Sequence, residues 1–417
     1  MSRDRRNDPP PLDSRRRERQ PAAPHVGREV HMHGPSARPD THGGKIREAS
    51  ALLGIPGGEL LDFSANINFL GPSPQAVAAA RRAVDEMGWY PLDPPDPLRR
   101  AAADFFRVSE ESVILGNGAS ELIFLVVAHL RPRRVLVLGP TFTEYERAAR
   151  AWGAEVDVAN AFEGADFAHT TADMRVLQPR LEAADLVFLC DPNNPTGDLW
   201  TRDARDAVID ICSRAETTVF VDESFLAFTA AWPDGGAVQP GVGVPPDHVI
   251  VLHSLTKILA MPGLRVGALL VSPEMAEGLA SRVPPWNVNC IAQAAAVAGL
   301  ADRTLLERTP GAVAVAREEV AAALRGTPGV ARVLPAAADF LCLRLDAPTA
   351  SEVTARLLRE HGVLVRDLSD FPGMGPRYLR VAVREPADNR RLVEALAAVL
   401  SDRVAATDEW EIEERRP

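Results

Sequence analysis

The sequence predicts an α/β protein with a mostly parallel sheet covered by helices and a smaller α+β domain at its carboxyl end. The first observation is an alternation, from about residue 41 to residue 400, of helical stretches with short apolar runs rich in β-branched residues. The second is that these runs are apolar on both faces, as expected for parallel strands covered on both sides. The third is size, since 417 residues of 46% hydrophobic composition can bury a large core in two or three domains.

The central domain is expected to span residues 76–285. Its strands are expected in the segments RRVLVLGP, AEVDVA, DLVFLCDP, TTVFVDES, HVIVLHS and RVGALLVSP. Helical length and spacing mark the intervening segments SELIFLVVAHL and ARDAVIDICSRAE. An active site is expected at the carboxyl ends of the parallel strands, near the cleft between the domains.

A smaller domain is expected over residues 286–400. A long alanine-rich helix is followed by the strands ADFLCLRL, GVLVRDL and RYLRVAVR and the helix NRRLVEALAAVL. That order predicts that residues 41–75 join this domain and share its sheet. Residues 1–40 contain nine arginines, six acids and almost no large apolar side chains, which predicts a disordered tail. A nucleic-acid-binding arm is disfavoured because the acids offset the arginines. Residues 401–417 are expected to form a second tail.

Composition narrows the classes of function. A formal net charge of -11 argues against a nucleic-acid or membrane-surface partner, because phosphate affinity rests on clustered lysine and arginine. The four cysteines lie far apart with no CxxC pair, so free thiols in a reducing cytosol are expected, with neither disulfides nor a metal site. No apolar run is long enough for a membrane span, and the amino terminus has no apolar core of a secretory signal. The expected location is the cytoplasm.

Three expected strands each end in a functional side chain. LVFLC leads into DPNNPTG with Asn194, TTVFV into Asp222, and HVIVLHS into Lys257. In addition, GNGASELIFLVV places a glycine-bracketed turn before a helix that opens at Ala119 and Ser120, whose free backbone amides can hold a phosphate.

Taken singly, each feature has a simpler interpretation. GNG suits a plain turn, Asn194 an Asx turn, Asp222 a helix cap, and Lys257 a solvated surface lysine. Together they supply a phosphate cradle, an amide, a carboxylate and a lysine, and Arg265 follows eight residues after that lysine. These are the groups needed to hold pyridoxal 5′-phosphate and to form its Schiff base.

The chemistry of that cofactor explains each residue type. A lysine nucleophile must be neutral, and desolvation beside the cationic Arg265 lowers the pKa of Lys257. A carboxylate such as Asp222 keeps the pyridine nitrogen protonated. Asn194 can donate a hydrogen bond to the phenolic oxygen of the ring. The phosphate would then meet the amides of the GNGAS turn, the hydroxyl of Ser254 and the planar guanidinium of Arg265.

The ordered motifs GNGAS, PTFTEY, DPNNPTG, VDES, SLTK and PGLRVG resemble the fold-type I aminotransferase superfamily over about 360 residues. The opening THGGKIREASALLGIPGGELLDFSANINFLGPSP resembles the threonine-phosphate decarboxylase branch, with histidinol-phosphate aminotransferases as sisters. The resemblance implies a seven-stranded, mostly parallel sheet in the large domain and a homodimer with active sites at the subunit interface. It also implies that the partner is a small-molecule amino-acid substrate.

The resemblance also implies residue roles. Lys257 would form the Schiff base, Asp222 would face the ring nitrogen, Asn194 would contact the ring oxygen and Phe142 would stack on the ring. Arg380 would hold the substrate carboxylate. The further substrate contacts would be His42, Gly43, Asn66, Asn194 and Arg366. Tyr90 would reach the cofactor phosphate of the neighbouring subunit.

Departures from the family pattern lie near the expected substrate mouth. Phe225 stands where a tyrosine is common, and Phe69 stands where a proline is usual. Ile258 and Leu259 stand where aromatic residues are usual. The stretch WYPLDPPDP is rearranged relative to the simpler YPD of relatives. The expected reaction is decarboxylation of an O-phosphorylated amino acid such as threonine phosphate. The alternatives are a histidinol-phosphate type aminotransferase and a branch member recruited to specialised metabolism with another amino-acid substrate.

Two other classes of protein share part of this pattern. Ser254 and Lys257 also spell SxxK, the nucleophile motif of penicillin-binding acyltransferases, but the companion SDN and KTG motifs are absent. A non-catalytic regulator on the same fold would need a DNA-binding domain, for which residues 1–40 are too short and too polar.

Overall fold

The computed structural model describes residues 43–160, 174–234, 236 and 245–413, with side chains up to residue 401. The expected tail over residues 1–40 and the predicted substrate residue His42 lie outside the described residues.

A seven-stranded sheet forms the centre of the fold, in the order β2-β8-β7-β6-β5-β3-β4. Its strands are β2 (Val113–Gly116), β3 (Arg134–Gly139), β4 (Glu155–Asn160), β5 (Leu186–Cys190), β6 (Thr218–Asp222), β7 (Val249–His253) and β8 (Gly267–Leu270). β8 runs antiparallel to both of its neighbours, whereas the strand pairs from β7 to β4 are parallel. The predicted α/β class with a mostly parallel seven-stranded sheet is therefore confirmed.

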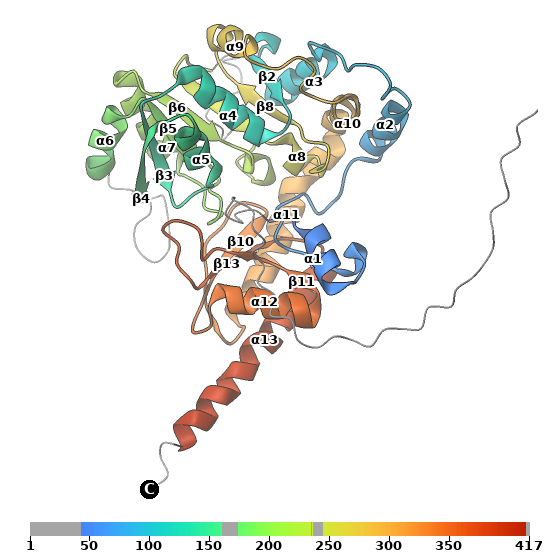
Figure 1. Cartoon of the computed structure of the whole chain (residues 1–417), viewed down its shortest axis with the longest axis vertical. Coiled ribbons are helices and arrows are strands. Elements are labelled where there is room, and N and C mark those ends of the chain that lie inside the picture. The colour runs from blue at the N-terminus through green and yellow to red at the C-terminus, as the bar shows by residue number, and fades with distance from the viewer. Residues whose placement is uncertain (1–42, 161–173, 235, 237–244, 414–417) are drawn as a thin grey trace, which may run out of the picture. The chain divides into compact units, whose positions relative to one another are not determined.

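Helices cover both faces of this sheet (Figure 1). One face packs against α4 (Ala119–Leu130), α5 (Glu144–Ala151) and α9 (Pro273–Ala280). The other packs against α2 (Pro74–Val84), α3 (Asp96–Phe106), α6 (Met174–Ala183), α7 (Arg202–Arg214) and α10 (Cys290–Ala301). Successive residues of β5 point to opposite cores, since Val187 and Leu189 lie in one and Leu186 and Phe188 in the other. This is why the strand sequences are apolar on both faces.

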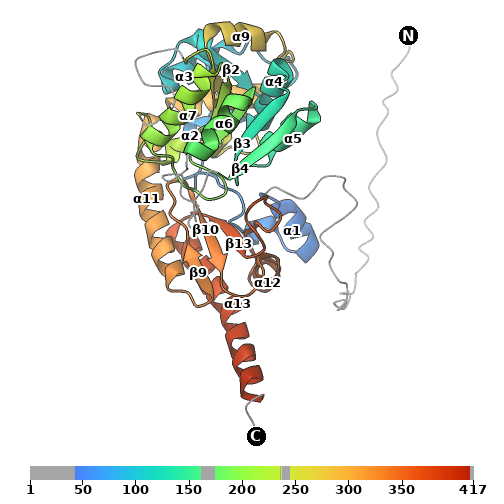
Figure 2. The ribbon, with the colours of Figure 1, turned by 90° about the vertical axis from the view of Figure 1, so that its left-hand side faces the viewer.

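A second, antiparallel sheet has the strand order β12-β13-β10-β9. Its strands are β9 (Val330–Val333), β10 (Phe340–Leu345), β12 (Arg366–Asp367) and β13 (Tyr378–Ala382). It shares a core with the helices α11 (Arg303–Arg325), α12 (Ala350–His361) and α13 (Pro386–Glu413), and Figure 2 shows α11 running beside β9 and β10. α13 continues the chain as helix through Glu413, where the sequence predicted a tail from residue 401.

The segment before residue 75 joins this second region. After α1 (Ile46–Leu53), the short strand β1 (Leu61–Asp62) pairs in parallel with β11 (Val363–Leu364), forming a separate two-stranded sheet. The N–H of Ala382 donates to the carbonyl of Phe63 at 2.8 Å, which ties the segment to β13 as well. Single turns of 3-10 helix lie at Gly57–Glu59, Glu110–Ser112 and Leu226–Phe228. Within the part of the chain that is described, every helix is too short or too polar to cross a lipid bilayer.

Candidate functional site

Three adjacent parallel strands bring Asn194, Asp222 and Lys257 to one edge of the large sheet. β5, β6 and β7 are neighbours in the sheet, and Asp222 pairs with Cys190 on one side and with Leu252 on the other. Asp222 is the last residue of β6, and Lys257 lies in the short helix α8 (Leu255–Ile258) just after β7. The topology therefore gathers the strand-end residues as the sequence predicted.

The Asp222 carboxylate is buried and held by two donors. The backbone N–H of Ser224 donates to Oδ1 at 2.9 Å, and the Tyr145 hydroxyl donates to Oδ2 at 2.6 Å. Burial raises the pKa of Asp222, while the hydrogen bonds from Ser224 and Tyr145 and the charge of Lys257 oppose that rise. Two fixed donors thus orient the carboxylate at the strand end. Tyr145 was missed as a site residue, although the PTFTEY motif contains it.

The Lys257 amine lies among charges of both signs. Burial lowers its pKa to about 8, helped by the charges of Arg380 and Arg265 and opposed by Asp339 and Asp222. A substantial fraction of this amine is therefore neutral slightly above neutral pH, as a lysine nucleophile requires. The chain has only two lysines, Lys45 and Lys257, against 44 arginines among its 46 basic residues. That scarcity, visible in the sequence, makes Lys257 stand out further.

A tight turn of backbone lies where the sequence predicted a phosphate cradle. Gly118 has φ of +85°, and a Cβ there would lie 2.3 Å from Nη2 of Arg265, so the guanidinium rests directly on this turn. Ala119 and Ser120 are the first two residues of α4, where backbone amides have no helical partner. A Cβ on Gly267 would lie 3.0 Å from the Ala119 nitrogen, which shows how closely β8 approaches the same turn.

Ser254 lies beside this turn. Its hydroxyl is 2.9 Å from the hydroxyl of Thr256, and the N–H of Thr256 donates to the carbonyl of Val266, the residue between Arg265 and Gly267. Phe142 is half-buried, with its ring centroid 5.6 Å from that of Tyr145 in an edge contact. The strand ends that carry Asp222 and Lys257 thus have three groups around them: the Gly118 turn, the Ser254 hydroxyl and the Phe142 ring.

Arg380 links the two regions of the fold. Its Nη1 donates to Oδ1 of Asn194, and its Nη2 donates at 2.8 Å to the carbonyl of Ser64. The guanidinium lies over the Phe340 ring, with Cζ 5.3 Å from the ring centroid. Within the described residues, the Nε of Arg380 has no hydrogen-bond partner. Burial lowers the pKa of Arg380 to about 9, with the charge of Arg366 acting in the same direction.

Arg366 lies directly across from Arg380, in register on β12 and β13. Both side chains are buried, each residue being 7% exposed. Nη2 of Arg366 donates to the Asp370 carboxylate at 3.2 Å, and its guanidinium lies over the Phe371 ring. The site therefore contains two adjacent, buried guanidinium groups.

The other predicted substrate residues are placed differently. Gly43 packs so closely on the Ser64 carbonyl that a Cβ would lie 2.1 Å from it, which brings Gly43 to Arg380. Asn66 is buried, and its Oδ1 has no hydrogen-bond partner in the described part of the chain. Tyr90 is 78% exposed and stacks on Trp286 with centroids 4.4 Å apart, so it is not gathered with the strand-end residues.

Asp339 is a site residue that the sequence did not reveal. It precedes β10, is 1% exposed, and neither carboxylate oxygen has a hydrogen-bond partner among the described residues. Burial raises its pKa to about 7, and the charges of Lys257, Arg380 and Arg317 oppose that rise. Within the apolar run ADFLCLRL, the sequence pattern predicts only a strand residue at this position.

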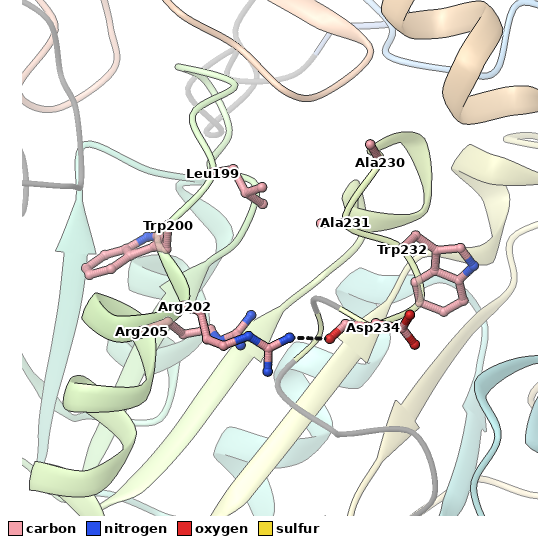
Figure 3. A pocket seen from close by; sticks show the side chains of 8 residues that line it. All are labelled: Leu199, Trp200, Arg202, Arg205, Ala230, Ala231, Trp232 and Asp234. Carbon is pink, nitrogen blue, oxygen red and sulfur yellow. Dashed lines mark hydrogen bonds between the residues drawn. The ribbon is translucent and has the colours of Figure 1, made fainter.

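A separate cavity of about 370 Å³ opens between the segments that follow β5 and β6 (Figure 3). One side of the cavity is lined by Leu199, Trp200, Arg202 and Arg205, and the other by residues 230–232 and 234. Across it, Arg202 donates a hydrogen bond to the carbonyl of Asp234 at 2.5 Å. None of the predicted site residues is among the lining residues. Across residues 43–160, 174–234, 236 and 245–413, no three His, Cys, Asp or Glu side chains form a group that could hold a metal ion.

The donor set fits pyridoxal 5′-phosphate. A side chain at Gly118 would collide with the Arg265 guanidinium. The guanidinium therefore lies directly against the turn that leads into the free backbone amides of α4. The backbone amides and the Arg265 guanidinium suit a phosphate. The fixed, buried carboxylate of Asp222 suits a protonated ring nitrogen. The partly neutral amine of Lys257 suits an aldehyde.

Comparison with known proteins gives a consistent result. The model of the family "Aminotransferase class I and II" matches residues 58–396. A threonine-phosphate decarboxylase of Salmonella typhimurium is 37% identical, with 86% of this chain and 96% of the relative covered. A histidinol-phosphate aminotransferase of Symbiobacterium thermophilum is 34% identical, with 88% and 97% covered. The crystal structure of the histidinol-phosphate aminotransferase from Clostridium acetobutylicum superposes with a TM-score of 0.75 at 26% identity, covering 82% of this chain and all of that one.

Proposed function

Because the chain belongs to the class I and II aminotransferase family, we propose that it uses pyridoxal 5′-phosphate to decarboxylate an O-phosphorylated amino acid such as threonine phosphate. Threonine-phosphate decarboxylase is the name of the relative that is 37% identical. The enzyme class and the cofactor follow from the family, whereas the reaction and the substrate are the proposal.

The proposed roles of the cofactor-binding residues follow from the contacts. The Lys257 amine would hold the cofactor through its aldehyde group. Asp222, fixed by Ser224 and Tyr145, keeps the ring nitrogen protonated. Asn194 accepts from Arg380 through Oδ1, so its Nδ2 can donate to the phenolic oxygen of the ring. The bound cofactor withdraws electrons from the bond that breaks at the substrate α-carbon.

The remaining cofactor contacts concern the phosphate and the ring face. We assign the phosphate to the amides of Ala119 and Ser120, the Ser254 hydroxyl and the Arg265 guanidinium. Phe142 stacks on the ring. Tyr90 supplies a contact to the cofactor phosphate from the neighbouring subunit.

The adjacent guanidinium groups of Arg366 and Arg380 are the main support for a phosphorylated amino acid as the substrate. Arg366 pairs with the exposed carboxylate of Asp370 at 3.2 Å, whereas Arg380 donates to the neutral Asn194 and Ser64. Two buried cations in register with a single carboxylate beside them suit a ligand that brings further negative charge. A phosphorylated amino acid brings two anionic groups: its carboxylate suits the fork of Arg380 and its phosphate suits Arg366. His42, Gly43 and Asn66 complete the proposed substrate contacts.

Decarboxylation requires that the bond to the carboxylate stands perpendicular to the cofactor ring. Arg380 holds that carboxylate from β13, and the phosphate contact to Arg366 fixes the other end of the substrate. Transamination would need the α-hydrogen in that position instead. An aminotransferase of the histidinol-phosphate type is the second candidate, favoured by the 34% identical relative. The third candidate is a different amino-acid substrate in specialised metabolism. It is favoured because Phe225, which stands where a tyrosine is common in the family, lies beside Lys257.

Incubation of the purified enzyme with phosphothreonine tests the proposal. Carbon dioxide and an amine phosphate are expected, without consumption of 2-oxoglutarate. Stoichiometric keto acid in the presence of 2-oxoglutarate, with no carbon dioxide, would refute decarboxylation and favour the aminotransferase.

We further propose that the active form is a homodimer in the cytoplasm. The exposed residues Met87, Trp89, Tyr90 and Leu92 form an apolar segment, 59% to 78% exposed, of a kind that subunit contacts cover. The four cysteines, all within the described residues, are free, which suits a reducing compartment.

A further inference from the structure

Asn68 is a buried asparagine to which the proposed roles give no task. The residue is 2% exposed. Its Oδ1 accepts from the N–H of Leu70 at 3.1 Å, and its carbonyl accepts from the N–H of Gly71 at 3.2 Å, so a tight turn follows it. Its donors, the backbone N–H and the two hydrogens of Nδ2, are bound to groups far away in the sequence.

Two of these donors bind the end of α8, the helix that contains Lys257. The backbone N–H of Asn68 donates to the Lys257 carbonyl at 3.2 Å, and its Nδ2 donates to the Ile258 carbonyl at 2.9 Å. Lys257 and Ile258 are the last two residues of α8, where carbonyl groups have no partner within the helix. Asn68 therefore binds both of the last carbonyls of this helix, from a position 190 residues before Ile258.

The second hydrogen of the Asn68 amide ties this contact to α11. Nδ2 also donates at 3.1 Å to the hydroxyl of Thr309, which itself donates to the Leu305 carbonyl at 2.8 Å. Because a hydroxyl has a single hydrogen, Thr309 accepts from Asn68 while it donates to Leu305. Thr309 is 0% exposed. One buried amide group thus joins three segments: the one before α2, the helix α8 and the helix α11.

The end of α8 depends on contacts from outside the helix. α8 has four residues, which is too short for a helix to be stable by itself. The chain then turns at Ala260, whose φ of +54° lies in the left-handed region that a residue with a Cβ disfavours. Such a conformation persists only where the surrounding structure holds it. Asn68 supplies two of the hydrogen bonds that do so.

We propose that Asn68 is a positioning residue for Lys257, which binds the carbonyls of Lys257 and Ile258 and so holds the Lys257 amine in place at the strand ends. The proposal deepens the proposed function and rests on the role of Lys257 there. The same segment reaches the substrate side of the site, since the Ser64 carbonyl accepts from Nη2 of Arg380 at 2.8 Å. Residues 64–68 therefore connect the guanidinium proposed for the substrate carboxylate with the helix of the lysine.

An absorbance titration of the cofactor-loaded, full-length enzyme tests this role, because the spectrum reports protonation of the nitrogen that Lys257 contributes. Asn68→Leu keeps the approximate size of the side chain and removes both donors of the amide. Burial is the largest cause of the lowered pKa of Lys257. A loosened α8 should admit water to this nitrogen and move the midpoint to higher pH, by about half a unit or more. Thr309→Val removes only the hydroxyl that anchors the amide, and it should give a smaller shift in the same direction.

Asn389→Leu is the matched control. Asn389 is a buried asparagine of α13, 6% exposed, whose Nδ2 donates to the Arg384 carbonyl at 2.7 Å. Its loss should lower the melting temperature as Asn68→Leu does, but the midpoint should stay at the wild-type value. All three variants keep the charged groups that act on the Lys257 amine, which are Arg380, Asp339, Arg265 and Asp222.

An unchanged midpoint in Asn68→Leu would overturn the positioning role, and so would an equal shift in Asn389→Leu, which would reflect lost stability alone. If Asn68→Leu does not fold, Thr309→Val decides by the same criteria. The titration needs no substrate, so it gives the same answer whether the enzyme decarboxylates or transaminates. Absence of a cofactor band in the wild type would instead overturn the role of Lys257, and the positioning role with it.

Discussion

Asp222 and Tyr145 form a buried pair whose two members contribute unequally to the proposed chemistry. Asp222→Asn should still bind the cofactor, but kcat should fall about a hundredfold or more, because the charge that keeps the ring nitrogen protonated is gone. Tyr145→Phe removes one hydrogen bond to a charged group and should lower kcat about tenfold. Steady-state kinetics together with cofactor titration separate the two effects. A fully active Asp222→Asn enzyme would remove Asp222 from the mechanism.

The two site arginines should differ in what they recognise. Arg380→Lys should raise KM for every amino-acid substrate, since a lysine cannot hold a carboxylate with two parallel hydrogen bonds. Arg366→Lys should reduce kcat/KM for phosphothreonine far more than for threonine. The exposed Arg377→Lys, near the start of β13, is the control and should match the wild type. Equal losses on both substrates in Arg366→Lys would argue that the phosphate binds elsewhere.

At the residue scale, the sequence predicted the groups that follow strands. Asp222 ends β6, and Asn194 and Lys257 follow within a few residues of the ends of β5 and β7, so their convergence follows from the parallel sheet alone. The partners of these groups are harder to predict. Tyr145 lies 77 residues before Asp222 on a helix face, and Asp339 lies within an otherwise apolar segment. Only the packed structure shows that both side chains reach the site.

At the scale of elements, the start of α4 depends on Gly118. Gly118→Ala should displace the Arg265 guanidinium, because a Cβ there would lie 2.3 Å from Nη2. Losing one charge-assisted contact to the phosphate should weaken cofactor binding about tenfold or more. Gly71→Ala is the matched control, since its φ of +78° imposes similar backbone strain but no atom lies within 4 Å. Equilibrium dialysis of the cofactor measures both, and equal affinities would contradict the proposed cradle.

The sequence predicted most strands of both sheets because their cores make them continuously apolar. β2 and β9 were not predicted, and the two middle residues of β9 are only half-buried. The antiparallel direction of β8 was also beyond the sequence, since chain direction is set by the connection through α8 and not by residue pattern. The division into domains at residues 285 and 286 stays a prediction, and α10 packs on α2 and α3 of the first region.

At the scale of the whole molecule, the exposed segment around Tyr90 should lie at a subunit contact. Sedimentation velocity should show a dimer for the wild type, and Met87→Glu should shift it toward monomer, because a charge would replace an apolar side chain in the contact. Val315→Glu introduces the same charge at an exposed valine of α11 and should leave the dimer intact. A monomeric wild type, loaded with cofactor and active, would exclude the proposed role of Tyr90.

The proposed function depends on the amine of Lys257, and Lys45 is the only other lysine in the sequence. Borohydride reduction of the loaded enzyme, followed by digestion and mass spectrometry, should place the reduced cofactor on the peptide that contains Lys257. Unmodified Lys257, or label found on Lys45 instead, would contradict the account.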